Sequence, residues 1–91
     1  MDRAEITQKV RQIVAKVTSI PAETIGADAN LREELGLDSL SLLEVGVNVD
    51  YEFKLNLPDL DQRMAGITTV ASAVTLVEEL LRERAAAAVL A

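Results

Sequence analysis

The sequence contains no cysteine and no histidine among its 91 residues. Without cysteine the chain can form neither a disulfide nor a thiolate metal site. Without histidine it lacks the commonest general base at neutral pH and the commonest metal ligand. A Ser–His–Asp triad and a zinc site built on His and Cys are therefore excluded within this chain.

Aromatic residues and positive charge are also scarce. Tyr51 and Phe53 are the only aromatic residues, so the core must be built from Leu, Val, Ile and Ala. The 9 Lys and Arg residues are outnumbered by 15 Asp and Glu residues, which gives a net charge of −6. An acidic chain is repelled by nucleic-acid phosphates and anionic membranes and attracted to basic protein surfaces. We therefore expect protein partners, and neither nucleic acid nor membrane.

The chain also lacks the features of an exported or membrane-anchored protein. No apolar run approaches the length of a membrane span. The first residues, Met1–Arg3, lack the basic and apolar segments of a signal peptide. A length of 91 residues suits one domain. These observations predict a cytoplasmic, monomeric domain.

The spacing of apolar residues predicts an all-α fold. Ile6, Val10 and Val14 repeat every four residues and predict a helix over residues 3–17, with Asp2 as its N-cap and Glu5 at the capping-box position. The next helix is predicted to open at Asp38-Ser39, to carry its apolar pattern from Leu40 to Phe53 and to be closed by Leu57-Pro58. A short helix is predicted over residues 59–65, with Pro58 in or beside its first turn. The last helix is predicted to begin after Thr68 or Thr69, with Arg82 and Arg84 near its C-terminus, where positive charge suits the helix dipole.

Residues 19–38 form a long connection between the first two helices. Pro21 and Gly26 interrupt it, but recurring aliphatic residues indicate that it packs against the body of the protein. We expect residues 30–35 to form a short turn of helix. The predicted fold is a compact four-helix bundle with a long loop between helices 1 and 2 and a short helix 3.

The most informative stretch is Leu35-Gly36-Leu37-Asp38-Ser39-Leu40. It places the Ser39 hydroxyl in the first turn of a helix, directly after the capping carboxylate of Asp38. A phosphoryl group on that oxygen would lie near the unpaired amides and the positive end of the helix dipole. Judged alone, however, Ser39 is better explained as an ordinary helix-start serine.

In its context this stretch resembles the acyl carrier protein family, whose attachment motif is Asp-Ser-Leu. The resemblance continues to about residue 82, through Glu44, Glu52-Phe53, Leu57-Pro58-Asp59 and Ile67-Thr68-Thr69-Val70. The extended motif is specific, whereas the tripeptide alone is weak. The resemblance implies a carrier domain over residues 1–84, followed by an alanine-rich tail over residues 85–91 that either extends the last helix or frays.

The resemblance also implies a function. A phosphopantetheinyl transferase would attach 4'-phosphopantetheine to Ser39, while Asp38 would cap the helix and help the transferase to bind its magnesium ion. The protein would not be an enzyme and would hold no metal. It would carry acyl intermediates as thioesters between acyl-loading, chain-extending and tailoring enzymes of polyketide or fatty-acid biosynthesis.

The helix over residues 39–53 has two apolar faces. One is formed by Leu40, Leu43 and Val47 and the other by Leu42, Val45 and Val49, and one of the two sets should face the core. The resemblance implies that Leu40, Leu43 and Val47 face partners, surrounded by the carboxylates of Glu44, Asp50 and Glu52, which would meet basic docking surfaces. Ser41 stands where many fatty-acid carriers have a carboxylate, and Tyr51 interrupts the acidic run. This thinner acidic patch favours a specialised polyketide-type pathway.

Three other functions compete with that of an acyl carrier. A peptidyl or aminoacyl carrier uses the same arm, but its motif often has Gly where this chain has Leu37. A helical adaptor would need no cofactor. A carboxylate-based enzyme is disfavoured because no pair of acids forms a recognisable catalytic motif.

The small aliphatic residues Val45, Val49 and Ala73 also fit a groove between helices 2 and 3 that shelters an acyl chain, although ordinary core packing explains them equally well.

Overall fold

The computed structural model describes residues 2–55 and 60–90 and is helical, with no strand in that part of the chain. The elements are α1 (Arg3–Thr18), a short 3₁₀ helix η1 (Ala22–Thr24), α2 (Ser39–Phe53), α3 (Leu60–Ala65) and α4 (Val70–Leu90). The predicted all-α fold with a long first connection and a short third helix is therefore confirmed. The sequence did not predict η1. The expected start of the third helix at residue 59, beside Pro58, lies outside the described residues.

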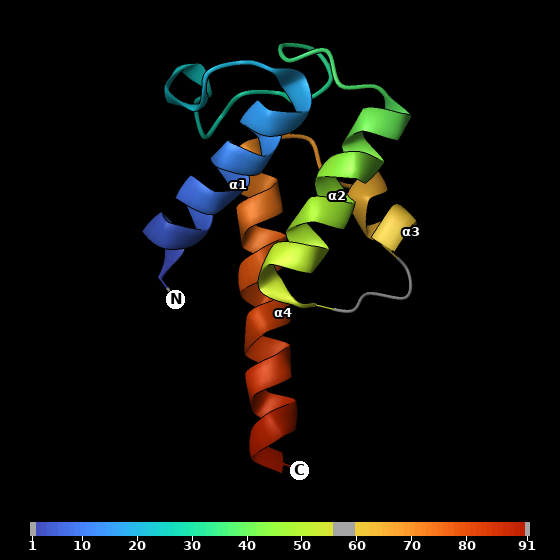
Figure 1. Cartoon of the computed structure of the whole chain (residues 1–91). Coiled ribbons are helices and arrows are strands. Elements are labelled where there is room, and N and C mark those ends of the chain that lie inside the picture. The colour runs from blue at the N-terminus through green and yellow to red at the C-terminus, as the bar shows by residue number, and fades with distance from the viewer. Residues whose placement is uncertain (1, 56–59, 91) are drawn as a thin grey trace.

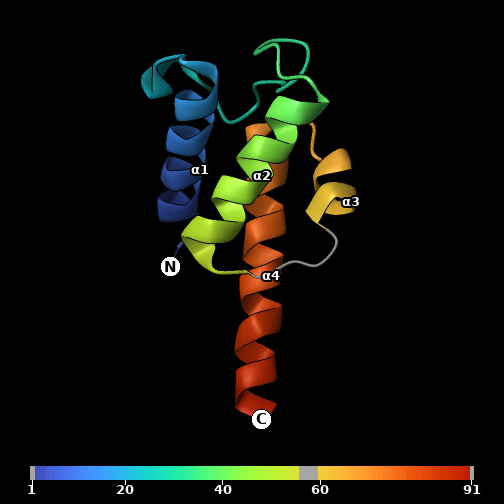
Figure 2. The ribbon, with the colours of Figure 1, turned by 45° about the vertical axis from the view of Figure 1, so that its right-hand side comes forward.

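α4 is the longest of the helices. α1 contacts both α4 and α2, and α3 packs against α2. Figures 1 and 2 show that α4 continues past the ends of its neighbours, while the loop before α2 crosses the opposite end of the bundle. Of the two alternatives for the alanine-rich tail, α4 takes the helical one as far as Leu90. None of the helices in the described ranges is both long and apolar enough to cross a bilayer.

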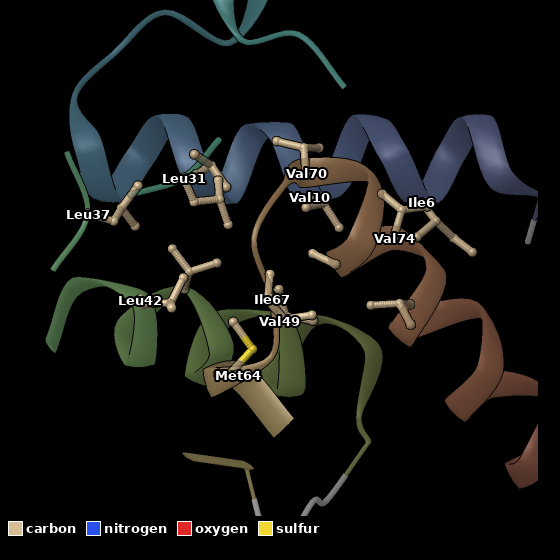
Figure 3. Close-up of a cluster of buried hydrophobic side chains, with 14 of the residues drawn as sticks. Ile6, Val10, Leu31, Leu37, Leu42, Val49, Met64, Ile67, Val70 and Val74 are labelled. Atoms are coloured by element: carbon tan, nitrogen blue, oxygen red, sulfur yellow. The ribbon is translucent and has the colours of Figure 1, made fainter. Parts of the chain in front are cut away.

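The core is built from aliphatic side chains, as the composition predicts. Its largest fully buried members are Ile6, Ile25, Leu31, Val10, Val14, Val45, Val70, Val74 and Val77. Figure 3 shows side chains from α1, α2, α3, α4 and the long loop converging on this cluster. No polar or charged residue of the described part is buried, so the hydrophobic effect provides most of the stabilisation.

α1 begins and ends as its sequence predicts. The Asp2 carboxylate accepts a hydrogen bond of 2.9 Å from the Glu5 amide and so caps the first turn. Ser19 follows the helix in the left-handed conformation, with φ 62°, and its amide donates to the Ala15 carbonyl. The left-handed residue ends the helix and turns the chain into the long loop.

The long loop is fixed to the body of the protein at several points. The Leu31 amide donates to the Thr68 carbonyl, and the Ala71 amide donates to the Ala27 carbonyl, both at 2.9 Å. The Arg11 guanidinium on α1 donates at 2.8 Å to two loop carbonyls, those of Ala22 and Ile25. Buried loop side chains add to these bonds, so the segment that leads to α2 has a defined path.

The expected short turn at residues 30–35 forms around Asn30. Its side-chain oxygen accepts hydrogen bonds from the Arg32 amide at 3.0 Å and the Glu33 amide at 2.8 Å. Its carbonyl accepts from the amides of Glu34 and Leu35. The Asn30 side chain thus caps a single hydrogen-bonded turn. The segment is a turn and not the expected turn of helix.

The expected position of Arg82 and Arg84 at a helix C-terminus is wrong, because α4 continues to Leu90 and its last turn has no basic residue. Arg84 instead reaches the end of a different helix. Its Nη1 donates to the Lys54 carbonyl at 2.5 Å and to the Phe53 carbonyl at 3.3 Å. These are carbonyls at the C-terminus of α2, where a cation is electrostatically favourable.

At its other end α4 begins with a reciprocal cap. The Thr69 hydroxyl accepts from the Ser72 amide at 3.1 Å, and the Ser72 hydroxyl accepts from the Thr69 amide at 2.9 Å. Of the two threonines predicted as the cap, Thr69 is therefore the one that serves. This arrangement satisfies amides that would otherwise be unpaired.

Candidate functional site

Ser39 is the first residue of α2, and buried residues on either side of it in the sequence anchor the backbone. Gly36 has a φ of +73°, a left-handed conformation that glycine adopts without strain. Leu37 is buried, and its amide donates to the Leu31 carbonyl at 2.9 Å. Leu42 is buried one turn into α2, whereas residues 38–40 between these two anchors are exposed. The fold therefore presents the Ser39 residue to solvent at a fixed position.

Asp38 occupies the N-cap of α2. Its Oδ1 accepts a hydrogen bond of 2.8 Å from the Ser41 amide, and its carbonyl accepts from the Leu42 amide at 2.9 Å. The hydrogen bond from the Ser41 amide is the largest cause that lowers the pKa of the Asp38 carboxyl from its ordinary value. The carboxylate is therefore charged at neutral pH, and it accepts from a first-turn amide, as expected of a helix cap.

A hollow of about 250 Å³ opens beside the serine. It lies between the long loop, α2 and α3 and is lined by Arg32, Ser39, Leu42, Leu43, Met64 and Ala65. Four of these six side chains are apolar, and Arg32 is the charged one. A phosphopantetheine arm joined to Ser39 would thus start at the edge of a space wide enough for part of it. The residues present fit that group.

The two apolar faces of α2 separate as the sequence indicates. Leu42, Val45 and Val49 are buried. On the outward face Leu40 is 75% exposed and Val47 is 53% exposed, while Leu43 is half-buried at the edge of the hollow.

Tyr51 belongs to the same outward stripe, and the sequence analysis did not place it there. It is 85% exposed and lies four residues, about one helical turn, after Val47. The spacing of Leu40, Val47 and Tyr51 by seven and four residues places all three on one face of the helix and could have predicted this. The stripe formed by Leu40, Leu43, Val47 and Tyr51 is called the α2 stripe below.

The carboxylates expected around this stripe have different surroundings. Glu44 is exposed, and Asp50 is half-buried. Glu52 is exposed but forms an ion pair of 2.8 Å with the Lys9 ammonium of α1. The hydrogen bond that Lys9 donates to the Glu52 carboxylate raises the pKa of Lys9. Since Lys9 is far from Glu52 in the sequence, spacing along α2 could not reveal that this charge is partly neutralised.

The expected groove for an acyl chain is closed. An apolar cavity between α2, α3 and α4 has a volume of about 10 Å³, and its lining includes Val49 and Ala73 but not Val45. A space of this size holds about one water molecule. An acyl chain could enter only if the helices moved apart. In the described ranges no group of His, Cys, Asp and Glu side chains is arranged to hold a metal ion.

Comparison with known proteins identifies the family. Residues 8–82 match the family described as "Phosphopantetheine attachment site". The chain is also 37% identical over 87 residues to a protein of Saccharopolyspora erythraea named "Acyl carrier protein", and the match covers 96% of this chain and 90% of that protein. Carriers of this kind bear a covalently attached 4'-phosphopantetheine arm and are not themselves enzymes. Fold, motif and similarity thus agree, and the chain belongs to the family of phosphopantetheine-bearing acyl carrier proteins.

Proposed function

We propose that Ser39 is the residue that bears the arm and that Asp38 is recognised by the transferase that attaches it. The observation that carries this proposal is the exposure of Ser39 at the start of α2, beside the 250 Å³ hollow. The chain has no histidine, and its adjacent carboxylate is engaged as a helix cap. The transferase must therefore supply the base that removes the hydroxyl proton. The serine oxygen then bonds to phosphorus, and the nucleotide part of coenzyme A leaves.

Intact-mass measurement tests this assignment. The protein is incubated with coenzyme A and a promiscuous phosphopantetheinyl transferase, and we expect the mass to rise by one arm. Ser39→Ala should abolish the gain, whereas Ser41→Ala, two residues further along the same helix, should retain it. A gain that survives Ser39→Ala would refute the assignment.

The α2 stripe and its carboxylates form the proposed docking surface. Leu40, Val47 and Tyr51 present exposed apolar area, and Glu44 adds an exposed negative charge beside them. Such a surface suits partner enzymes with basic rims around an apolar contact, because exposed charges speed and orient association without making release slow. Asp50 and Glu52 complete the acidic surround, with Glu52 shared with Lys9.

Charge reversal tests the docking surface. Glu44→Lys should slow attachment of the arm and reduce the dependence of its rate on salt. Glu79→Lys makes the same change at an exposed position on α4 and serves as the matched control. If both variants behave like the unmodified protein, docking takes place on a different face.

The proposed cargo is an acyl intermediate of polyketide or fatty-acid biosynthesis, with a polyketide-type pathway favoured. The relative named as an acyl carrier protein supports acyl cargo over the aminoacyl cargo of a peptidyl carrier. Loading the protein in an extract of its native cells and identifying the thioester by mass spectrometry tests this. An aminoacyl thioester would contradict it. Size-exclusion chromatography of the same sample should show the proposed monomer.

A further inference from the structure

The start of α2 already holds one negative charge, that of the capping Asp38 carboxylate. Asp38 accepts hydrogen bonds from the Ser41 and Leu42 amides through its carboxylate and its carbonyl. The first turn of α2 contains no basic residue to offset the Asp38 charge. A phosphodiester on Ser39 would add a second negative charge beside the first. A nearby cation would offset that added charge.

Arg32, in the long loop, is the basic residue that lies beside Ser39. It lines the same hollow as Ser39 and is exposed. Within residues 2–55 and 60–90, its guanidinium forms no hydrogen bond or ion pair. Its backbone amide is bound to the Asn30 side chain at 3.0 Å, so the turn fixes where the side chain starts. An exposed guanidinium without a partner offers several N–H donors to an anion, and its planar geometry suits two phosphate oxygens at once.

We propose that Arg32 binds the phosphodiester formed on Ser39 and thereby directs the first part of the arm into the hollow between α2 and α3. This inference rests on the proposed attachment at Ser39. The walls that the arm would meet are the apolar side chains of Leu43, Met64 and Ala65. Arg32 is thus a positioning residue for the arm, and its role is separate from recognition by the transferase.

NMR spectroscopy of the unmodified and arm-bearing proteins tests the proposal. Exposed charge pairs shift a population by about two- to fivefold, so exchange of the Arg32 Nε proton with water should slow by about that factor when the arm is attached. The Nε proton of Arg82, an exposed arginine on α4, should not respond. High salt should reverse the change at Arg32.

Variants at position 32 give the second readout. Arm attachment to the parent protein should shift the amide signals of Met64 and Ala65. In Arg32→Ala these shifts should fall by about two- to fivefold, while the shift at Leu40, next to the attachment site, persists. Arg32→Lys should retain part of the effect, and Arg82→Ala should retain all of it. Because the Asn30 contact uses the Arg32 backbone, Arg32→Ala should keep the turn, which circular dichroism verifies.

The outcomes separate this inference from the assignment of Ser39. Absence of a mass gain in the parent protein refutes the attachment proposal itself. A normal mass gain with an unresponsive Arg32 Nε proton, or with equal Met64 and Ala65 shifts in Arg32→Ala, overturns only the role of Arg32.

Discussion

Replacing Arg84 should destabilise the end of α2, although Arg84 belongs to α4. Its guanidinium donates to the carbonyls of Phe53 and Lys54, at 3.3 and 2.5 Å. Hydrogen bonds from charged donors contribute up to about 3 kcal/mol, but Arg84 is exposed and one of the two bonds is long. A cation at an exposed helix C-terminus contributes about 0.3–1 kcal/mol. We therefore expect Arg84→Ala to cost about 1 kcal/mol of unfolding free energy.

Thermal unfolding followed by circular dichroism measures this loss. For a domain of this size, about 1 kcal/mol lowers Tm by about 4–8 °C. Arg82→Ala is the matched control, because it removes the same charge from the same helix two residues earlier. Both substitutions change intrinsic helix propensity equally, so the difference between the two variants isolates the contact with α2.

Hydrogen exchange locates the effect. The amides of Lys54 and Leu55 both donate to the Asp50 carbonyl at the end of α2. In Arg84→Ala their exchange should be about fivefold faster, which corresponds to the expected loss. If Arg82→Ala lowers Tm as much as Arg84→Ala does, or if these two amides are unaffected, the contact with α2 does not stabilise the protein.

Three further predictions concern the long loop, the cap of α2 and the docking surface. Leu31→Ala should cost about 2–5 kcal/mol in urea unfolding, because this loop side chain is fully buried; a cost below that of the exposed Leu40→Ala would contradict its role as an anchor. The Asp38 carboxyl has a pKa below its ordinary 3.8, so its stabilisation is present above that value and is lost as pH falls through the folded pKa. The stability gap between the parent and Asp38→Ala should therefore shrink in acid, and a gap independent of pH would refute this. Lys9→Ala should release Glu52 from its ion pair and speed attachment of the arm at low salt; an unchanged rate would place Glu52 outside the docking surface.

Local patterns in the sequence predicted the helices well. The apolar repeat of Ile6, Val10 and Val14 predicted α1, and its N-cap at Asp2 accepts the Glu5 amide as expected. The spacing along α2 also predicted two apolar faces, and the family resemblance indicated that the face with Leu42, Val45 and Val49 is the buried one. These features depend on neighbours within one or two helical turns, which a sequence shows directly.

Features that depend on distant neighbours could not be predicted in the same way. The role of Arg84 depends on the end of α2, some 30 residues away in the chain. The pairing of Lys9 with Glu52 joins α1 to α2. Such contacts follow from the packing of whole helices, and no local pattern encodes them. Arg32 lies between these cases, because its turn is local but its place beside Ser39 depends on the path of the loop.

The long loop before α2 fixes the position of the start of that helix, and this explains its length in physical terms. A long flexible connection would let the start of α2 move, and a transferase would then have to select one arrangement of Ser39 from many. Here backbone hydrogen bonds of 2.9 Å join Leu31 to Thr68 and Ala71 to Ala27, and the buried Leu37 immediately precedes the Asp38 cap. The loop therefore connects the start of α4 to the start of α2, and Ser39 and Arg32 take their positions from that connection.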